Sequence, residues 1–469
     1  MASRVRAAYS LGNIANRECN GTGRMATWST VAEIHLTAQS RVFEHGWQSW
    51  TPARDYVVGE PPRRPVSANS RRVNWRGDSD YSDAFQSDGL MAVTPEPGGS
   101  VHLFAARDAH EQVPRIRAHP TGDVLRVEAD GPVAHAVDAG AGGVQGALAR
   151  WAREFALTMD AGPLRPVPTL WCSWYHYGTE VTEAEILENT RVAQERELGI
   201  DVIQIDDGYQ AGYGDWLVDS DRFGSTRNLV ARITEHGFIA GIWTAPLLVG
   251  AASQLAAEHP DWLVTNSCGH PVSAGLNWGQ ALYALDATHP GAGDYLRQVY
   301  STLAAWGVGF HKLDFLYAGA LPGRRYAEVT GIQAYRQGME LIRDVLGEVQ
   351  VLGCGAPLLP SIGLVDAMRV SCDTGANWEP GDGDLGAPSM RGAIQSGCAR
   401  AFMQGRFWSN DTDCLLARPS LRWRDRWAAH VDRFGGARGS SDRLADLDEW
   451  GEKVTRKILA GSTTKPFGA

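Results

Sequence analysis

Cysteine is scarce in this sequence of 469 residues: there are seven, an odd number, and no two of them form a CxxC pair. This count and spacing argue against a disulfide framework and against a zinc ribbon. We therefore expect reduced thiols, which indicates the cytoplasm. The cysteines are Cys19, Cys172, Cys268, Cys354, Cys372, Cys398 and Cys414.

Long apolar runs are lacking as well. No stretch approaches the length that spans a membrane, and the first residues, MASRVRAAYSLGN, lack the apolar core of a signal peptide. Basic residues are outnumbered, with 44 Lys and Arg against 54 Asp and Glu, a net charge of -10 and a pI near 5.7. This balance argues against nucleic acid or an anionic membrane as a partner. We expect a small-molecule substrate, and the sequence leaves the oligomeric state open.

Patterns that bind metals or phosphate are missing too. The 13 histidines form no HxH or HExxH, and only His176 and His311 fall near predicted strand ends. The glycine-rich turns at Gly21 and Gly353 are too short for a phosphate-binding loop. The sequence therefore predicts neither a metal ion nor an organic cofactor.

Tryptophan, in contrast, is abundant, with 17 residues in a chain that is 43% hydrophobic. Flat, amphipathic rings serve carbohydrate sites, although most tryptophans in a large protein belong to its core. A chain of this length can bury a large core and is expected to form two domains.

Residues 1–142 are expected to form an antiparallel β-sandwich. They show short alternating or apolar runs cut by Gly, Pro, Asn and Asp, without a sustained helical period. Residues 143–169 are predicted to be a helical linker, with a helix over 143–158 and a proline-stiffened segment over 163–169.

Residues 170–469 repeat one unit: a helical stretch, a glycine, and a short apolar strand. Four such units in series indicate parallel strands joined by helices, so the fold class is α/β and a (β/α)8 TIM barrel is the best architecture. A doubly wound sheet is the alternative. Strands are predicted over 170–177, 200–208, 238–246, 310–316, 348–355, 366–373 and 406–411, with a weak eighth near 435–442.

Charged residues gather at the carboxyl ends of these strands, where barrels carry their chemistry. They are Asp206, Asp207, Lys312, Asp314, Arg369, Asp373 and Asp411. Side chains alternate along a strand, so Lys312 and Asp314 point to the same side. Hydrolysis of a glycosidic bond requires two carboxylates across such a mouth, one to attack or activate water and one to protonate the leaving oxygen.

Other interpretations of these residues remain open. The pair Lys312 and Asp314 is also compatible with a buried structural ion pair, and a single acid is more often a helix cap or a surface partner. A non-catalytic carbohydrate-binding protein would also use Trp and Asp clusters. It would not need a protonated acid opposite an ionised nucleophile, which is the role expected for Asp373 opposite Asp314.

Several motifs carry a resemblance to a known family. They include WCSWYHYG from Trp171, QIDDGYQ from Gln204, GIWTAPL from Gly241, KLDFLYAGALPGR from Lys312, GCGAPLLPSIGL from Gly353, MRVSCDTG from Met368 and FWSNDTDCLLA from Phe407. From about residue 165 to 418 the chain resembles the retaining α-galactosidases of glycoside hydrolase family 36, particularly the compact bacterial form. The N-terminal region is similar chiefly through HGWQSWT from His45.

The resemblance implies an exo-acting enzyme that releases terminal α-D-galactosyl residues from melibiose- or raffinose-type sugars by a two-step double displacement. It implies Asp314 as the nucleophile and Asp373 as the general acid/base. The implied substrate-binding residues are Asp206, Asp207, Lys312, Arg369, Trp174, Tyr175, Trp243, Cys354, Asp411 and Trp47. An α-N-acetylgalactosaminidase or an α-galactosyl transglycosidase would use the same site, although Cys354 matches the galactose-specific pattern.

Two departures from the family pattern stand out. Family members carry a C-terminal β-sandwich, whereas this chain stops at Ala469, so we expect that domain to be absent. Cys372 and Gly375 stand where the family has prolines around the acid/base, so the loop 374–387 is expected to differ in shape. Asp366 and Glu379 are the competing candidates for the acid.

Overall fold

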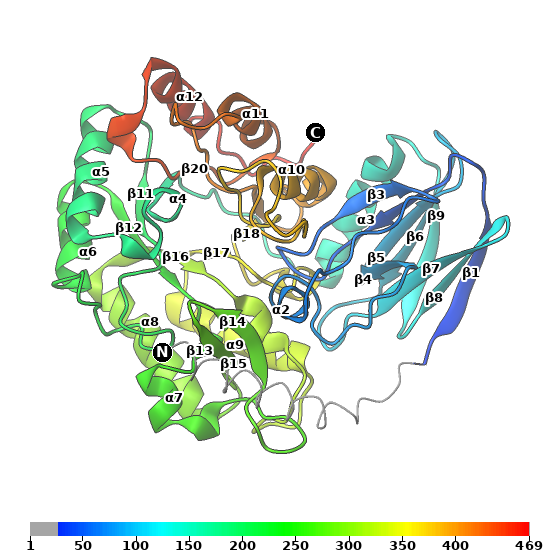
Figure 1. The fold of residues 1–469 in the computed structure, drawn as a ribbon, viewed down its shortest axis with the longest axis horizontal. Helices are drawn as coiled ribbons and strands as arrows, with labels where there is room; N and C mark the ends of the chain where they lie inside the picture. The colour runs from blue at the N-terminus through cyan, green and yellow to red at the C-terminus, as the bar shows by residue number, and fades with distance from the viewer. Residues whose placement is uncertain (1–26, 469) are drawn as a thin grey trace.

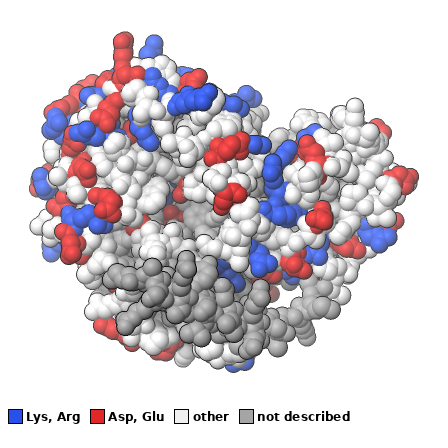
Figure 2. Space-filling view, viewed as in Figure 1, with Lys and Arg blue, Asp and Glu red and all other residues white. Residues whose placement is uncertain are grey.

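The computed structural model describes residues 27–468, which form two parts lying side by side (Figure 1). The blue and cyan part is built of antiparallel sheets, and the green to red part surrounds a sheet of parallel strands. Acidic and basic side chains alternate over both parts on the face in Figure 2.

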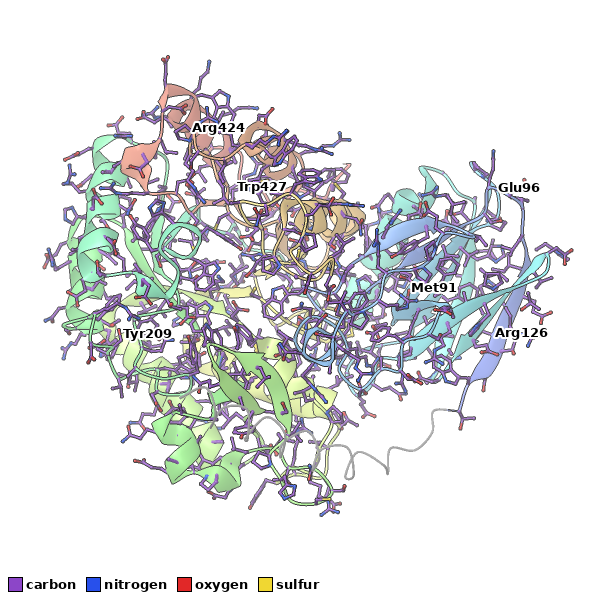
Figure 3. All side chains as sticks on the ribbon, in the orientation of Figure 1. Met91, Glu96, Arg126, Tyr209, Arg424 and Trp427 are labelled. Atoms are coloured by element: carbon purple, nitrogen blue, oxygen red, sulfur yellow. The ribbon has the colours of Figure 1, made fainter. Side chains whose placement is uncertain are left out.

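The N-terminal part is an antiparallel β-sandwich, as the sequence predicts. Its sheets run in the orders β1-β8-β7-β4 and β3-β2-β5-β6-β9. The strands are β1 (Ser29–His35), β2 (Arg41–Glu44), β3 (Arg54–Val57), β4 (Phe85–Asp88), β5 (Leu90–Thr94), β6 (Val101–Ala106), β7 (Arg115–Thr121), β8 (Val124–Ala129) and β9 (Val133–Asp138). Apolar residues of both sheets form one core that includes Met91, whereas Arg126 lies on an exposed face (Figure 3).

Two helices accompany the sandwich. The short α2 (Ala68–Val73) contacts β14 of the second part, and α3 (Gly143–Thr158) follows β9. The bounds of α3 match the helix expected over 143–158, and residues 161–169 that follow contain no helix or strand.

The second part is the predicted (β/α)8 barrel. Its eight parallel strands run in the order β19-β18-β17-β16-β12-β11-β10-β20. The strands are β10 (Leu170–Cys172), β11 (Val202–Ile205), β12 (Ile239–Thr244), β16 (Val308–Leu313), β17 (Gln350–Gly353), β18 (Ala367–Arg369), β19 (Ser409–Asp411) and β20 (Gly439–Ser440). A parallel bridge between Asp411 and Ala437 joins the two ends of the sheet and closes the ring.

Helices follow most of these strands and cover the barrel. They are α4 (Trp174–Tyr177), α5 (Glu183–Glu195), α6 (Thr226–Glu235), α7 (Gln254–Glu258), α8 (Pro290–Trp306), α9 (Gly331–Leu346), α10 (Met390–Ala399), α11 (Arg424–Phe434) and α12 (Glu449–Leu459). A capping box begins α5: the Thr182 side chain accepts from the backbone N of Glu185, and the Glu185 side chain accepts from the backbone N of Thr182. Gly307 ends α8 at a φ of 98°, which a side chain would disfavour.

Three local features differ from the sequence prediction. The predicted strand over 170–177 is wrong beyond Cys172, because pairing with β11 stops there and Trp174–Tyr177 form the helix α4. The predicted strand over 366–373 is wrong beyond Arg369, because β18 ends there and Asp373 lies in the loop that follows. An antiparallel sheet of β13 (Leu248–Gly250), β14 (Ser273–Asn277) and β15 (Gln280–Ala284) is inserted after β12, where no strands were predicted.

The cysteines correct one expectation. Cys268 is disulfide-bonded, so the prediction of reduced thiols is wrong there. The free cysteines among residues 27–468 are Cys172, Cys354, Cys372, Cys398 and Cys414, and Cys19 and the turn at Gly21 lie outside the described residues. Within the described residues no helix is long and apolar enough to cross a membrane, and no group of three or more His, Cys, Asp or Glu is arranged to hold a metal ion.

Candidate active site

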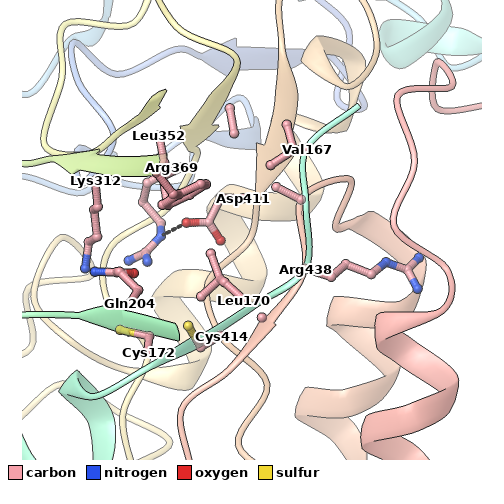
Figure 4. A pocket seen from close by; sticks show the side chains of 14 residues that line it. Val167, Leu170, Cys172, Gln204, Lys312, Leu352, Arg369, Asp411, Cys414 and Arg438 are labelled. Carbon is pink, nitrogen blue, oxygen red and sulfur yellow. Dashed lines mark hydrogen bonds and ion pairs between the residues drawn. The ribbon is translucent and has the colours of Figure 1, made fainter. Parts of the chain in front are cut away.

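The barrel interior changes from apolar to charged along its axis. Inward-facing residues of the strands and of the segments beside them form an apolar layer of Val167, Leu170, Cys172, Val202, Phe310, Leu352, Ala367, Cys414 and Ala437. The next inward-facing positions are polar: Gln204, Lys312, Arg369 and Asp411 border a cavity of about 10 Å³ together with that layer (Figure 4). This volume is about what one water molecule needs. Alternation along the strands therefore turns these polar side chains into the barrel, and they lie toward its carboxyl end, as predicted.

Asp206, at the end of β11, is bound to Lys312 of β16. The Nζ of Lys312 donates to Oδ2 of Asp206 over 2.9 Å, and the Gln204 amide and the Cys172 thiol donate to the same oxygen over 2.6 and 3.2 Å. Burial alone would raise the pKa of Asp206, but the charge and hydrogen bond of Lys312 hold that pKa below its ordinary value. Asp206 is therefore an anion poised to accept further hydrogen bonds.

Asp207 is buried beside it in a different environment. The Gln210 amide donates to its carboxylate over 2.6 Å and the Tyr213 hydroxyl over 3.2 Å. Burial raises the pKa of Asp207 to about 7, and the hydrogen bond from Gln210 offsets this only in part. The two neighbouring acids thus have pKa values shifted in opposite directions.

Asp314 directly follows β16, and its carboxylate is held by neutral donors. The indole Nε1 of Trp243 donates to one oxygen over 3.0 Å and the backbone N of Phe315 to the other over 2.7 Å. Phe315 has a φ of 50°, a left-handed conformation that is costly for a large side chain and concentrates at functional sites. Cys354, at the end of β17, is buried, and burial with the nearby charge of Asp314 raises the pKa of its thiol.

Arg369, at the end of β18, joins three carboxylates. Its guanidinium lies 2.9 Å from Asp373, 2.9 Å from Asp411 and 2.8 Å from Asp413. Asp373 is the most open of the three, with 27% of its side chain exposed. Burial in the barrel mouth raises the pKa of Asp373 to about 7. The charge of Arg369 lowers this pKa, and the charges of Asp413 and Asp314 raise it.

Asp413 was not among the residues predicted from the sequence. It is fully buried, and the hydroxyl of Tyr175 and the backbone N of Thr374 donate to the same oxygen. The only signal for it was its place two residues after Asp411 in the motif FWSNDTDCLLA. Tyr175, a predicted pocket residue on α4, is brought into the cluster by this contact.

A set of aromatic rings lies around Asp314. Trp278, at the turn between β14 and β15, stacks on Tyr213 with ring centres 3.7 Å apart and lies 5.0 Å from Phe315. The ring of Trp243 packs edge-on against the rings of Tyr213 and Trp278. Trp278 and Tyr213 were not predicted from the sequence. Trp278 was missed because the short strands of the inserted sheet that carries it were not predicted.

The loop 45–53 of the sandwich docks on the barrel. The guanidinium of Arg400 donates to backbone oxygens of Ser49 and Thr51 over 2.8 and 2.7 Å and to Val370 at the end of β18 over 2.8 Å. The ring of Trp50 packs on Phe315 with centres 4.9 Å apart. The N-terminal part is thus joined to the residue next to Asp314.

The remaining predicted residues lie as follows. The ring of Trp47 is buried against the guanidinium of Arg76, at 4.7 Å, while its backbone oxygen accepts from the N of Leu358. Trp174 is half-buried on α4 and packs against the apolar layer of the barrel.

The competing acid candidates are occupied elsewhere. Asp366 precedes β18, at the opposite end of the barrel, where it pairs with Arg165 and Arg343 at 2.6 and 2.9 Å. Glu379 is 54% exposed and pairs with Arg391 at 2.6 Å.

Known proteins resemble this chain in sequence and fold. The model of the Melibiase family matches residues 157–316. The solved structure of TtGalA, an α-galactosidase from Thermus thermophilus in complex with p-nitrophenyl α-D-galactopyranoside, is 30% identical and superposes with a TM-score of 0.79 over 94% of this chain and 90% of that one. The chain belongs to the α-galactosidases of glycoside hydrolase family 36.

Curated relatives match over shorter stretches. The α-galactosidase AgaA of Geobacillus stearothermophilus is 26% identical over 196 residues, which are 38% of this chain and 26% of that protein. A blood-group A α-D-galactosamine galactosaminidase of Flavonifractor plautii is 29% identical over 129 residues, 26% of this chain and 12% of that protein. The matched part of the chain spans about a quarter or less of the length of these curated relatives.

Proposed function

We propose that the protein is a retaining, exo-acting α-galactosidase that hydrolyses terminal α-D-galactosyl residues of melibiose- or raffinose-type oligosaccharides. Family membership supports the reaction class, and the relative bound to an aryl α-galactoside supports the sugar. The observation that carries the proposal is a pair of carboxylates in the barrel mouth: Asp314 directly follows β16, and Asp373 lies in the loop after β18. Asp314 and Asp373 sit close enough for the charge of one to raise the pKa of the other.

In the first step Asp314 would attack the anomeric carbon while Asp373 gives its proton to the glycosidic oxygen, so that the bond to the leaving sugar breaks. In the second step Asp373 takes a proton from water, which displaces Asp314 from the sugar. The two environments suit these roles. Two N–H donors hold the carboxylate of Asp314, whereas the pKa of Asp373 is raised to about 7, so that Asp373 keeps its proton up to that pH.

The galactose would be held by the charged residues around this pair. We assign Asp206 and Asp207 to the 4- and 6-hydroxyls, Lys312 to the 3- and 4-hydroxyl side and Arg369 to the 2-hydroxyl side. Trp243, Cys354, Tyr175, Trp174 and Trp47 are proposed to line the pocket, with Asp411 orienting Arg369. The ion pair of Lys312 with Asp206 supports a shared contact with the 4-hydroxyl, because both side chains meet at one point.

A panel of aryl α-glycosides tests the proposal: the galactoside, the N-acetylgalactosaminide and the glucoside, with the β-galactoside as the control. We expect hydrolysis of the α-galactoside, and proton NMR of the first product should show α-galactose before mutarotation. Preference for the N-acetylgalactosaminide would instead establish the α-N-acetylgalactosaminidase alternative. Transfer to an added acceptor sugar would show transglycosylation.

Binding of galactose without turnover of any panel member would support the non-catalytic alternative. Isothermal titration calorimetry with galactose distinguishes this outcome from a protein that does not recognise galactose at all.

A further inference from the structure

Three carboxylates share the single positive charge of Arg369. The guanidinium contacts Asp373 through Nη1, Asp411 through Nε and Asp413 through Nη2, at 2.9, 2.9 and 2.8 Å. One positive charge against three negative ones leaves an excess of negative charge in a buried cluster. Such a cluster holds a proton more strongly than an isolated acid does, and its members titrate as a group.

Asp413 is the centre of the hydrogen bonds in this cluster. Besides the bond from Arg369 it accepts from the hydroxyl of Tyr175, from the backbone N of Thr374 over 2.8 Å and from the backbone N of Cys414 over 2.7 Å. Thr374 directly follows Asp373. Asp413 therefore contacts three groups that surround Asp373: the guanidinium of Arg369, the phenol of Tyr175 and the backbone N of Thr374.

The backbone at Asp413 is held in an unusual conformation. Its φ is 85°, in the left-handed region that favours glycine, and the side chain is completely buried. A residue keeps such a conformation only when the surrounding structure fixes it, and strained backbone clusters at functional sites. The local structure is thus built around this carboxylate.

We propose that Asp413 is a positioning residue of the acid/base: it fixes Arg369, Tyr175 and the chain at Thr374 around Asp373, and its negative charge keeps a proton on Asp373. This inference rests on the proposed function, since Asp373 needs its proton only if it protonates a leaving group.

The exposure of the three acids indicates which one delivers the proton. The exposed fraction of the side chain is 27% for Asp373, 10% for Asp411 and 0% for Asp413. Only Asp373 opens substantially to the mouth, so a proton held by the cluster can reach a substrate there. The charged and titratable groups that face Asp373 or Asp413 are Arg369, Lys312, Asp314, Asp411, Tyr175, Cys354, Cys372 and Cys414.

The variant Asp413→Asn removes the charge and keeps the size of the side chain. Without this like charge, and with Arg369 freer to pair with it, Asp373 should lose its proton at a lower pH. We expect the basic limb of kcat/KM against pH, measured with melibiose, to move down by about 1 pH unit or more. Melibiose is the substrate of choice because its leaving sugar has to be protonated.

Asp442→Asn is the matched control. Asp442 is likewise fully buried after a barrel strand and ion-paired, with Arg418 at 2.8 Å, but it lies outside the cluster. The basic limb of the Asp442→Asn protein should stay at the wild-type pH, even if the melting temperature of this variant falls. An unchanged limb in a folded Asp413→Asn protein, or an equal shift in Asp442→Asn, would overturn the inference.

If Asp413→Asn does not fold, Tyr175→Phe tests the same point. The hydrogen bond from Tyr175 lowers the pKa of Asp413, so without it Asp413 is protonated in more of the molecules and its negative charge is lost there. The limb should then move in the same direction by a smaller amount, and an unmoved limb would speak against the role. A wild-type protein that cleaves no glycoside refutes the proposed function instead. In that case a carbon-13 NMR titration of the aspartate carboxyls still compares the pKa of Asp373 between wild type and variant.

Discussion

Lys312 of β16 pairs with Asp206, 2.9 Å away at the end of the second barrel strand, and not with Asp314, which directly follows β16. Alternation along β16 correctly places Lys312 and Asp314 on the same side, but the ion pair crosses β12 to reach β11. The carboxylate of Asp314 is left with neutral donors, Trp243 and the N of Phe315. A carboxylate without a cationic partner at contact distance keeps more of its nucleophilic character, which suits the role proposed for Asp314.

The buried pair makes a prediction about stability. Lys312→Met should lower the free energy of unfolding by roughly 3–5 kcal/mol, because it leaves the charge of Asp206 buried without its partner. Lys457→Met is the control: Lys457 pairs with Asp432 at a similar distance, 2.7 Å, but is 70% exposed. That loss should stay below about 1 kcal/mol. Urea unfolding of both variants measures the difference, and similar losses would contradict the prediction.

The nucleophile makes a prediction about activity. Asp314→Ala should lower kcat on an aryl α-galactoside by about three orders of magnitude or more while the fold survives, because no covalent intermediate can form. Azide or formate is expected to restore turnover and to give a product of inverted configuration at the anomeric carbon, visible by NMR. Near-normal retaining activity in this variant would move the role to another residue.

Much of the site could be predicted because a parallel barrel converts sequence position into spatial position. Strand ends face one mouth, so Asp206, Asp314 and Arg369 are brought to one end of the barrel by their places in the sequence alone. The same alternation places Lys312 inside.

Residues beyond the strand ends could not be predicted in this way. Asp413 follows β19 in a left-handed conformation, and nothing in its spacing shows that it turns back toward Arg369. Trp278 comes from an inserted sheet whose short strands have no clear alternation. Trp50 reaches Phe315 from a loop that the buried Arg400 helps to hold against the barrel, and Arg400 and this loop are about 350 positions apart, so no local pattern encodes the contact.

The docked loop makes a prediction about affinity. Trp47→Ala is expected to weaken galactose binding without unfolding the barrel, as proposed for a residue that lines the pocket. Trp50→Ala is the comparison, since it removes the ring that packs on Phe315 beside Asp314 and should weaken binding through that contact. Calorimetry gives the affinity and thermal unfolding gives the stability. A Trp47→Ala protein with a much lower melting temperature and unchanged affinity would make Trp47 a core residue that supports Arg76.

The acid/base makes a prediction about leaving groups and pH. Nitrophenolate departs with little help, whereas the alkoxide of a sugar must be protonated as it leaves. Asp373→Ala should therefore slow the cleavage of melibiose far more than that of an activated aryl α-galactoside.

The pKa of Asp373 is raised to about 7, so its protonated form, which acts as the acid, is present below that pH and is lost as the pH rises through it. In the wild type kcat/KM for melibiose should fall above about pH 7, and in Asp373→Ala this limb should be absent. Glu379→Gln serves as the control, because Glu379 is exposed and pairs with Arg391, and it should keep both the rate and the limb. Equal losses on the two substrates in Asp373→Ala, or a selective loss on melibiose in Glu379→Gln, would assign the acid to a different residue.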